Sequence, residues 1–151
     1  LDLNWVRRRF VYVEKGWGGC DELKGGYDNR VGQCAAAIAT CEGPDLFGGC
    51  SQSRECTHGE DGDRTGERDG DHELTGVYNV GTEEAYTFNE MVEMINDALG
   101  TDIDPEYIEC PFDGYVHDTM ADISKFHEAT GWEPQISFEE GVERVCEPYY
   151  D

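Results

Sequence analysis

The sequence contains little positive charge. Among its 151 residues, 11 lysines and arginines are outnumbered by 34 aspartates and glutamates, and the formal net charge at pH 7 is −23. Such a chain repels the phosphates of nucleic acids and the anionic surfaces of membranes, so we expect neither as a partner. A surface rich in carboxylates and poor in lysine is typical of proteins that stay soluble in molar salt. We therefore predict a halophilic protein with an acidic surface.

A long apolar run is also missing. No segment is apolar over the length needed to span a bilayer, and the first residues, LDLNWVRRRFVYVEK, carry charges where a signal peptide needs an apolar stretch. We therefore predict a cytoplasmic protein. With 38% hydrophobic residues, the chain has enough apolar material for one domain with a core and is too short for two. We predict a single domain over residues 1–151.

The seven cysteines do not form the pattern of a disulfide framework. Their odd number excludes complete pairing, and a cytosol keeps thiols reduced. Cys50, Cys56 and His58 lie close together in the sequence and are the candidates for a metal site. None of these residues is separated from the next by the short gap that a zinc knuckle requires, so we predict no metal.

Residues 76–100 carry strand, turn and helix signals that agree with one another. The β-branched and aromatic run at 77–80 predicts a buried strand. Thr87 and Glu90 have the spacing of a capping box, so a helix is expected to begin there and to end at Gly100. The apolar residues of that helix recur at the spacing of one face: Phe88, Met91, Val92, Ile95 and Leu99.

The other segments complete a mixed α/β (α+β) domain of about four helices and a few short strands. Further helices are expected from about residue 28 to 43, from Asp122 to 131, and from Ser137, which has Glu140 three residues later, towards 148. Short strands are expected at 106–109 and, from a weaker alternation, at 51–57.

Residues 58–72, HGEDGDRTGERDGDH, contain no large apolar side chain. They cannot bury a hydrophobic face, so we predict a flexible acidic loop. A calcium loop is the alternative that the closely spaced carboxylates suggest. No register of this segment satisfies the EF-hand spacing of acidic residues, glycine and glutamate, which argues against a dedicated calcium site.

Two runs in the second half, GVYNVGTEEAYTFNEMVEMINDALG and ADISKFHEATGWEPQISFEEGVERV, resemble a known family. They look like the C-terminal part of the extended short-chain dehydrogenases/reductases, the NAD-dependent sugar-nucleotide epimerases and dehydratases. In the first half, LFGGCSQSRECTHGED is more faintly similar to the family pattern G-x-G-x-Q-x-R-D-F-x-x-V-D-D. The resemblance implies that the chain corresponds to the substrate-binding part of such an enzyme, from a halophilic archaeon-like source.

Two features of that family are missing from these 151 residues: the glycine-rich dinucleotide turn after the first strand and the Tyr-x-x-x-Lys pair. We therefore predict a non-catalytic domain that binds no cofactor and, with apolar surface uncovered, self-associates. Two alternatives remain open. The chain is a component of an NAD-dependent epimerase or dehydratase that is active only with a separate dinucleotide-binding chain, or it is a metal-binding module that uses its cysteines and histidines.

The resemblance also implies a sugar-nucleotide site. Arg54 matches the family arginine that pairs with the diphosphate, a role that suits a bidentate guanidinium. His117 and Asp122 lie in or near the loop that closes over the nucleotide in relatives. An equally supported interpretation makes Arg54 a surface charge paired with Glu55 or Asp61. The sequence leaves both interpretations open.

Overall fold

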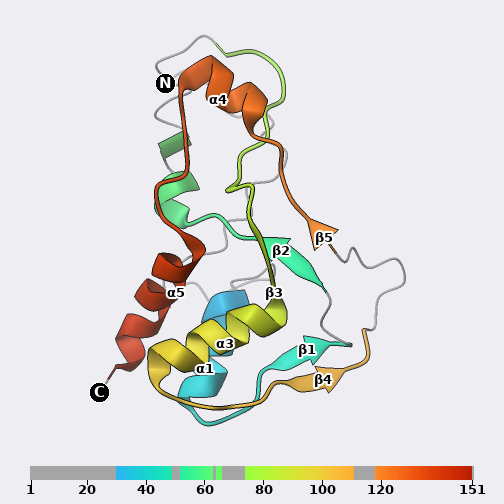
Figure 1. Ribbon diagram of the computed structural model, residues 1–151, viewed down its shortest axis with the longest axis vertical. Coiled ribbons are helices and arrows are strands. Elements are labelled where there is room, and N and C mark those ends of the chain that lie inside the picture. The colour runs from blue at the N-terminus through green and yellow to red at the C-terminus, as the bar shows by residue number, and fades with distance from the viewer. Residues whose placement is uncertain (1–29, 49–51, 63, 66–73, 111–117, 151) are drawn as a thin grey trace, which may run out of the picture.

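The computed structural model describes residues 30–48, 52–62, 64–65, 74–110 and 118–150. Figure 1 shows an elongated molecule with helices at both ends and short strands between them. The predicted mixed α/β class is confirmed. Within the described residues, no helix has the length and apolarity needed to cross a bilayer. In chain order the elements are α1 (Arg30–Ala39), β1 (Asp45–Phe47), β2 (Ser53–Glu55), β3 (Ala85–Thr87), α3 (Phe88–Leu99), β4 (Glu106–Ile108), β5 (Asp118–Thr119), α4 (Ser124–Thr130), α5 (Phe138–Cys146) and the 3-10 helix η2 (Glu147–Tyr149).

Helices α1, α3 and α5 pack together at one end of the molecule and form what we call the three-helix core. Helix α3 begins as expected, because the Glu90 amide donates to Thr87 Oγ1 (3.2 Å) and the Thr87 amide donates to the Glu90 carboxylate (2.7 Å). It ends at Gly100, whose φ of 66° is left-handed. The helices predicted for these three segments are confirmed. Their buried side chains are Val31, Cys34, Ala35, Ile38, Phe88, Met91, Val92, Ile95, Phe138, Val142 and Cys146.

Two small sheets lie beside this core. Strands β1 and β4 pair in parallel, and the predicted strand at 106–109 is confirmed as β4. In the second sheet, β2 is central, antiparallel to β3 and parallel to β5. Arg54, in the middle of β2, is therefore opposite Tyr86 on one side and Thr119 on the other.

The buried strand expected at 77–80 is absent: this segment has no strand, and the strand before α3 is β3 instead. Val80 is buried (5% exposed) whereas Val77 is 48% exposed, so the segment does not bury a continuous run. The Val77 carbonyl accepts a hydrogen bond from Lys125 Nζ (2.6 Å). A side chain of α4 thus supplies the partner that a neighbouring strand would have provided.

A second hydrophobic cluster, which we call the α4 cluster, surrounds that helix at the other end of the molecule (Figure 1). It consists of Val80, Ile123, Phe126 and Trp132. The rings of Phe126 and Trp132 lie 5.7 Å apart between centroids. Helix α4 ends at Gly131 with a left-handed φ of 67°, as the sequence predicts.

The sequence predicts a loop over residues 58–72. In the structure, residues 59–62 and 64–65 of this segment are helical. This helical segment buries polar side chains, which a search for apolar residues cannot detect. Asp61 is fully buried, and its carboxylate accepts hydrogen bonds from the backbone amides of Gln135 (3.0 Å) and Ile136 (3.0 Å) and pairs with Arg64. Residues 63 and 66–72 lie outside the described residues, and the flexibility of the segment stays a prediction.

Candidate functional site

Arg54 occupies the middle of the three-stranded sheet and is half-buried. Its Nη1 donates to the carbonyl of Ser53 (3.1 Å). Because residues directly opposite in neighbouring strands project to the same face, Tyr86 and Thr119 share the face of Arg54. Glu55, the next residue along β2, projects to the opposite face. The guanidinium is thus held on a rigid strand rather than on a loop.

The parallel pairing of β2 with β5 brings Arg54 beside a segment 65 residues away. Asp118 Oδ1 accepts hydrogen bonds from the Ser53 amide (3.2 Å) and hydroxyl (2.7 Å), which anchors the first residue of β5 to β2. His117 lies outside the described residues, immediately before β5. The structure therefore places Asp118 and Thr119, but not His117, next to the strand that carries Arg54.

Glu55 is a buried carboxylate (8% exposed) that binds three backbone amides. Its Oε1 accepts from Thr82 (2.5 Å) and Glu83 (2.6 Å), and its Oε2 accepts from Ala121 (2.6 Å). A Cβ added to Gly81 would overlap this carboxylate, so a larger residue there would displace the Glu55 side chain from its present position. Three charge-assisted hydrogen bonds compensate the buried negative charge.

Asp122, the third predicted site residue, is exposed and lies two residues before helix α4. Its Oδ1 accepts from the amide (3.0 Å) and hydroxyl (2.6 Å) of Ser124, and these bonds hold the pKa of its carboxyl below the usual value. The prediction that Asp122 caps α4 is wrong, because the N-cap position is Ile123 and no side chain caps the helix there. The Asp122 carboxylate instead binds Ser124, the first residue of the helix. Arg54 and Asp122 belong to segments joined through β5, but Asp122 is engaged with its own helix.

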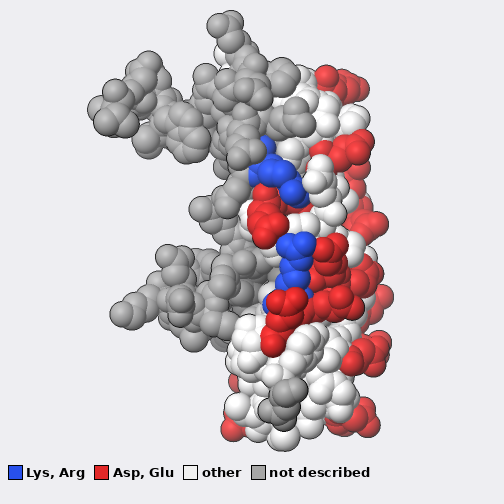
Figure 2. Space-filling view, turned by 90° about the vertical axis from the view of Figure 1, so that its left-hand side faces the viewer, with Lys and Arg blue, Asp and Glu red and all other residues white. Residues whose placement is uncertain are grey.

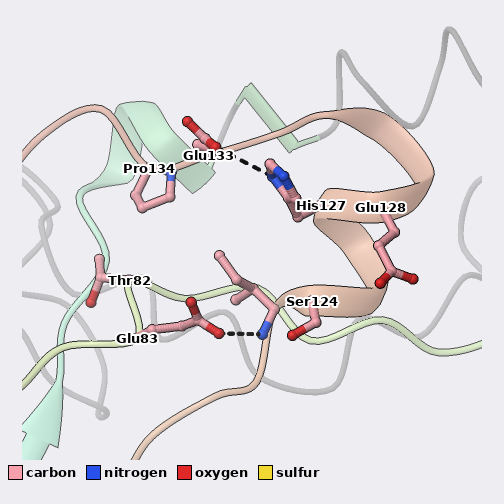
Figure 3. Close-up of a pocket in the computed structure, with 8 residues that line it drawn as sticks. Thr82, Glu83, Ser124, His127, Glu128, Glu133 and Pro134 are labelled. Atoms are coloured by element: carbon pink, nitrogen blue, oxygen red, sulfur yellow. Dashed lines mark hydrogen bonds and ion pairs between the residues drawn. The ribbon is translucent and has the colours of Figure 1, made fainter.

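A pocket of about 560 Å³ lies beside α4 (Figure 3). His127 Nδ1 lies 3.6 Å from a carboxylate oxygen of Glu133, and Glu83 accepts from the Ile123 amide (3.3 Å). The carboxylates of Glu83, Glu128 and Glu133 border this space and no lysine or arginine among the described residues does, so it disfavours an anionic ligand. Arg54 does not line it. The lining residues are Thr82, Glu83, Ile123, Ser124, His127, Glu128, Glu133 and Pro134.

The two described residues considered for a metal site, Cys56 and His58, make different contacts. Cys50 lies outside the described residues, and Cys56 packs against the three-helix core. His58 is half-buried, its Nδ1 accepts from the Glu60 amide (3.2 Å), and burial lowers the pKa of its imidazole. In the part of the chain that the structure describes, histidine, cysteine and carboxylate side chains form no group of three that could hold a metal ion.

Glu55 and Asp61, the partners considered for a surface Arg54, are both buried in networks of their own. Glu55 binds the amides of the loop before β3 and of Ala121, and Asp61 binds amides 135–136 and Arg64. These roles of Glu55 and Asp61 were not predicted from the sequence. The signal was present in the family pattern R-D-F-x-x-V-D-D, which has acidic residues at the positions of Glu55, Glu60 and Asp61. When an acidic residue recurs at one position of a family pattern within a strand or helix, a buried carboxylate that binds backbone amides is one explanation.

The outer surface carries the excess of acid. Figure 2 shows acidic side chains along the length of the described face, with few basic side chains between them. Arg144 on α5 is one of the basic residues; it pairs with Glu140 (2.7 Å) and Glu60 (3.2 Å). A net charge of −23 opposes any anion at long range, so an anion site needs a local cation.

The fold is similar to part of several solved sugar-nucleotide epimerases. The chain is similar to UDP-glucose 4-epimerase from Thermotoga maritima, solved with UDP-glucose (27% identity, TM-score 0.75, 81% of this chain and 39% of that one). It is also similar to UDP-N-acetylglucosamine 4-epimerase from Methanobrevibacter ruminantium (27% identity, TM-score 0.73, 82% of this chain and 40% of that one). A third similar structure is an epimerase from Methanothermobacter thermautotrophicus (25% identity, TM-score 0.75, 82% of this chain and 37% of that one). No family model and no curated protein matches the sequence.

These structures confirm the resemblance to the NAD-dependent sugar-nucleotide epimerases of the short-chain dehydrogenase/reductase family. The chain spans about 40% of the length of these solved relatives, which agrees with the expected C-terminal part.

Proposed function

We propose that this chain is the sugar-nucleotide-binding part of an epimerase-like protein and that Arg54 binds the diphosphate of the ligand. The observation that carries the proposal is the parallel pairing of β2 with β5, which sets Arg54 opposite Thr119 and Ser53 opposite Asp118, the residue that follows His117 in the sequence. The resemblance assigns both Arg54 and His117 to the nucleotide site. Two of the similar epimerases were solved with UDP-linked ligands, UDP-glucose and UDP-N-acetylmuramic acid.

The proposed role is binding without turnover by this chain alone. The 151 residues contain no Tyr-x-x-x-Lys pair and no glycine-rich dinucleotide turn. NAD is therefore not expected to bind. The acidic surface supports a function in molar salt, where screening weakens the repulsion of an anionic ligand. In such salt a short-range, bidentate contact to Arg54 retains its hydrogen bonds.

The test is calorimetric titration of UDP-glucose into the whole chain in molar KCl. We expect weak binding by the wild type and a loss of at least about tenfold in affinity for Arg54→Ala, because a charge-assisted pair is removed. Arg144→Ala is the matched control: it removes the same charge from an exposed ion-paired site on α5 and should bind as the wild type does. Binding that survives in Arg54→Ala, or its absence in the wild type, would contradict the proposal.

We also propose that the chain self-associates. Three exposed apolar side chains on its surface support this: Tyr107 and Ile108 on β4 and Met120 after β5. Sedimentation velocity in molar KCl should detect a species larger than the 16.9 kDa monomer. The double variant Tyr107→Ser with Ile108→Ser should shift the distribution towards monomer, while a monomeric wild type would refute self-association.

A further inference from the structure

We infer that Glu55 is a positioning residue for Arg54. Its carboxylate holds β2 against the two segments that flank it, the loop before β3 and the chain after β5. The inference rests on the proposed function, because it assigns Glu55 a role in that same site. Nothing in the proposed contact with the diphosphate itself requires Glu55.

The first step is the geometry of the strand. Arg54 and Glu55 are consecutive in β2, so their side chains project to opposite faces of the sheet. Glu55 is buried and faces Gly81, while Arg54 is half-buried on the other side. Glu55 is therefore placed to act through the backbone rather than by touching a ligand at Arg54.

The second step concerns the length of β5. This strand has only two residues, Asp118 and Thr119, so few ladder hydrogen bonds join it to β2. Side chains anchor it at both ends: Asp118 accepts from Ser53 at one end, and Glu55 accepts from Ala121 at the other (2.6 Å). The pair of Arg54 and Thr119 lies between these two anchors.

The third step is electrostatic. A free carboxylate next to Arg54 in the sequence would weaken an anion site. Here three backbone amides, those of Thr82, Glu83 and Ala121, donate to Glu55 and compensate its charge. The same bonds that position the strand thus reduce the repulsion of a diphosphate on the opposite face.

The variant Glu55→Gln separates these contacts. Its amide oxygen can still accept from Thr82 and Glu83, but its NH2 group then meets the Ala121 amide, donor against donor. We expect UDP-glucose affinity to fall at least about tenfold, the Ala121 amide to exchange at least about tenfold faster, and the NOE between Arg54 and Thr119 to weaken.

Asp61→Asn is the matched control, because it makes the same change at another buried carboxylate that binds backbone amides. Its partners, Gln135 and Ile136, lie outside the strands that flank Arg54. We expect faster exchange at those amides, with the Arg54–Thr119 NOE and the UDP-glucose affinity within about twofold of the wild type. All measurements are made in molar KCl on chains that circular dichroism shows to be folded.

The outcomes separate the two ideas. If the wild type binds UDP-glucose and Glu55→Gln binds equally well, the positioning role is overturned while the proposed function stands. If the wild type does not bind, the proposed function fails, and the Arg54–Thr119 NOE in Glu55→Gln still decides whether Glu55 holds β5 in place. A Glu55→Gln chain that stays unfolded where Asp61→Asn folds would assign Glu55 to the whole fold and overturn its role in positioning Arg54.

Discussion

The three-helix core and the α4 cluster are stabilised in different ways. The core buries the apolar stripes of three helices, and its helix ends are capped within a few residues of the chain. The α4 cluster is smaller, and the segments around it are joined by buried carboxylates bound to backbone amides. Glu55 belongs to β2, which lies between the two regions in Figure 1. Asp61 binds residues 135 and 136, in the chain between α4 and α5. One region is therefore specified by apolar periodicity and the other by polar contacts between distant segments.

The largest expected loss of stability comes from a substitution in the α4 cluster. Phe126 is fully buried and contacts the rings of Tyr78 and Trp132, so Phe126→Ala should destabilise the fold by about 3–5 kcal/mol. If the two regions are separable, the loss is confined to α4 and residues 74–81. Amide exchange would then rise there while α3 keeps its protection. Equal loss of protection in α3 would show that both regions unfold as one cooperative unit.

This comparison explains what could be predicted from the sequence. The stripe of Phe88 and Ile95 and the Thr87 cap predicted α3, because every signal came from residues within a few turns of one another. Arg54 could be assigned only through the family pattern, since its neighbour Thr119 is brought to it by a strand 65 residues later.

The strand predicted at 77–80 and the loop predicted at 58–72 were wrong for the same physical reason. Residues 77–80 have strand propensity, but Lys125 and the α4 cluster determine their conformation. The helical residues 59–62 and 64–65 have no apolar face, and they are held by Asp61, whose partners among the backbone amides, those of Gln135 and Ile136, lie more than 70 residues away. Local composition cannot detect a contact of this kind.

The second prediction tests the buried hydrogen bonds of Asp61. Asp61→Asn should lower the free energy of unfolding by about 1–3 kcal/mol, because a buried carboxylate that binds two amides and Arg64 loses its charge. Denaturant unfolding in molar KCl measures the change. Asp97→Asn, the same substitution on the exposed face of α3, should stay within about 0.5 kcal/mol of the wild type. Equal effects of the two substitutions would refute the structural role of Asp61.

A smaller loss of stability is expected when the N-terminal cap of α3 is removed. Thr87→Ala removes the hydroxyl that accepts from the Glu90 amide and should cost about 1 kcal/mol. Thr87→Ser keeps that hydroxyl and should restore most of the loss. The bonds from Thr87 also hold the pKa of Glu90 below its usual value. The stabilisation by Glu90 is therefore present above its unfolded pKa and is lost as the pH falls through the folded pKa, more clearly in the wild type than in Thr87→Ala.

The smallest effect concerns Tyr86, which joins the central sheet to the three-helix core. Its ring stacks on Phe138 with centroids 4.4 Å apart, and its hydroxyl donates to Glu84 and Glu139 (both 3.2 Å). Burial, together with the Glu139 carboxylate, raises the pKa of Tyr86 to about 12. Ionisation would place a phenolate beside two carboxylates, which disfavours the charged form in the folded chain.

A folded pKa above the unfolded value of about 10 means that Tyr86 contributes its full stabilisation below pH 10 and loses it as the pH rises towards 12. The wild type should therefore lose stability over this interval faster than Tyr86→Phe, which keeps the ring but has no group to ionise. Thermal unfolding of both chains at matched pH in molar KCl measures the difference, and the subtraction removes the titration of the other tyrosines. Parallel curves for the two chains would show that the Tyr86 hydroxyl titrates as freely in the folded chain as in the unfolded one, and would refute the effect of Glu84 and Glu139 on it.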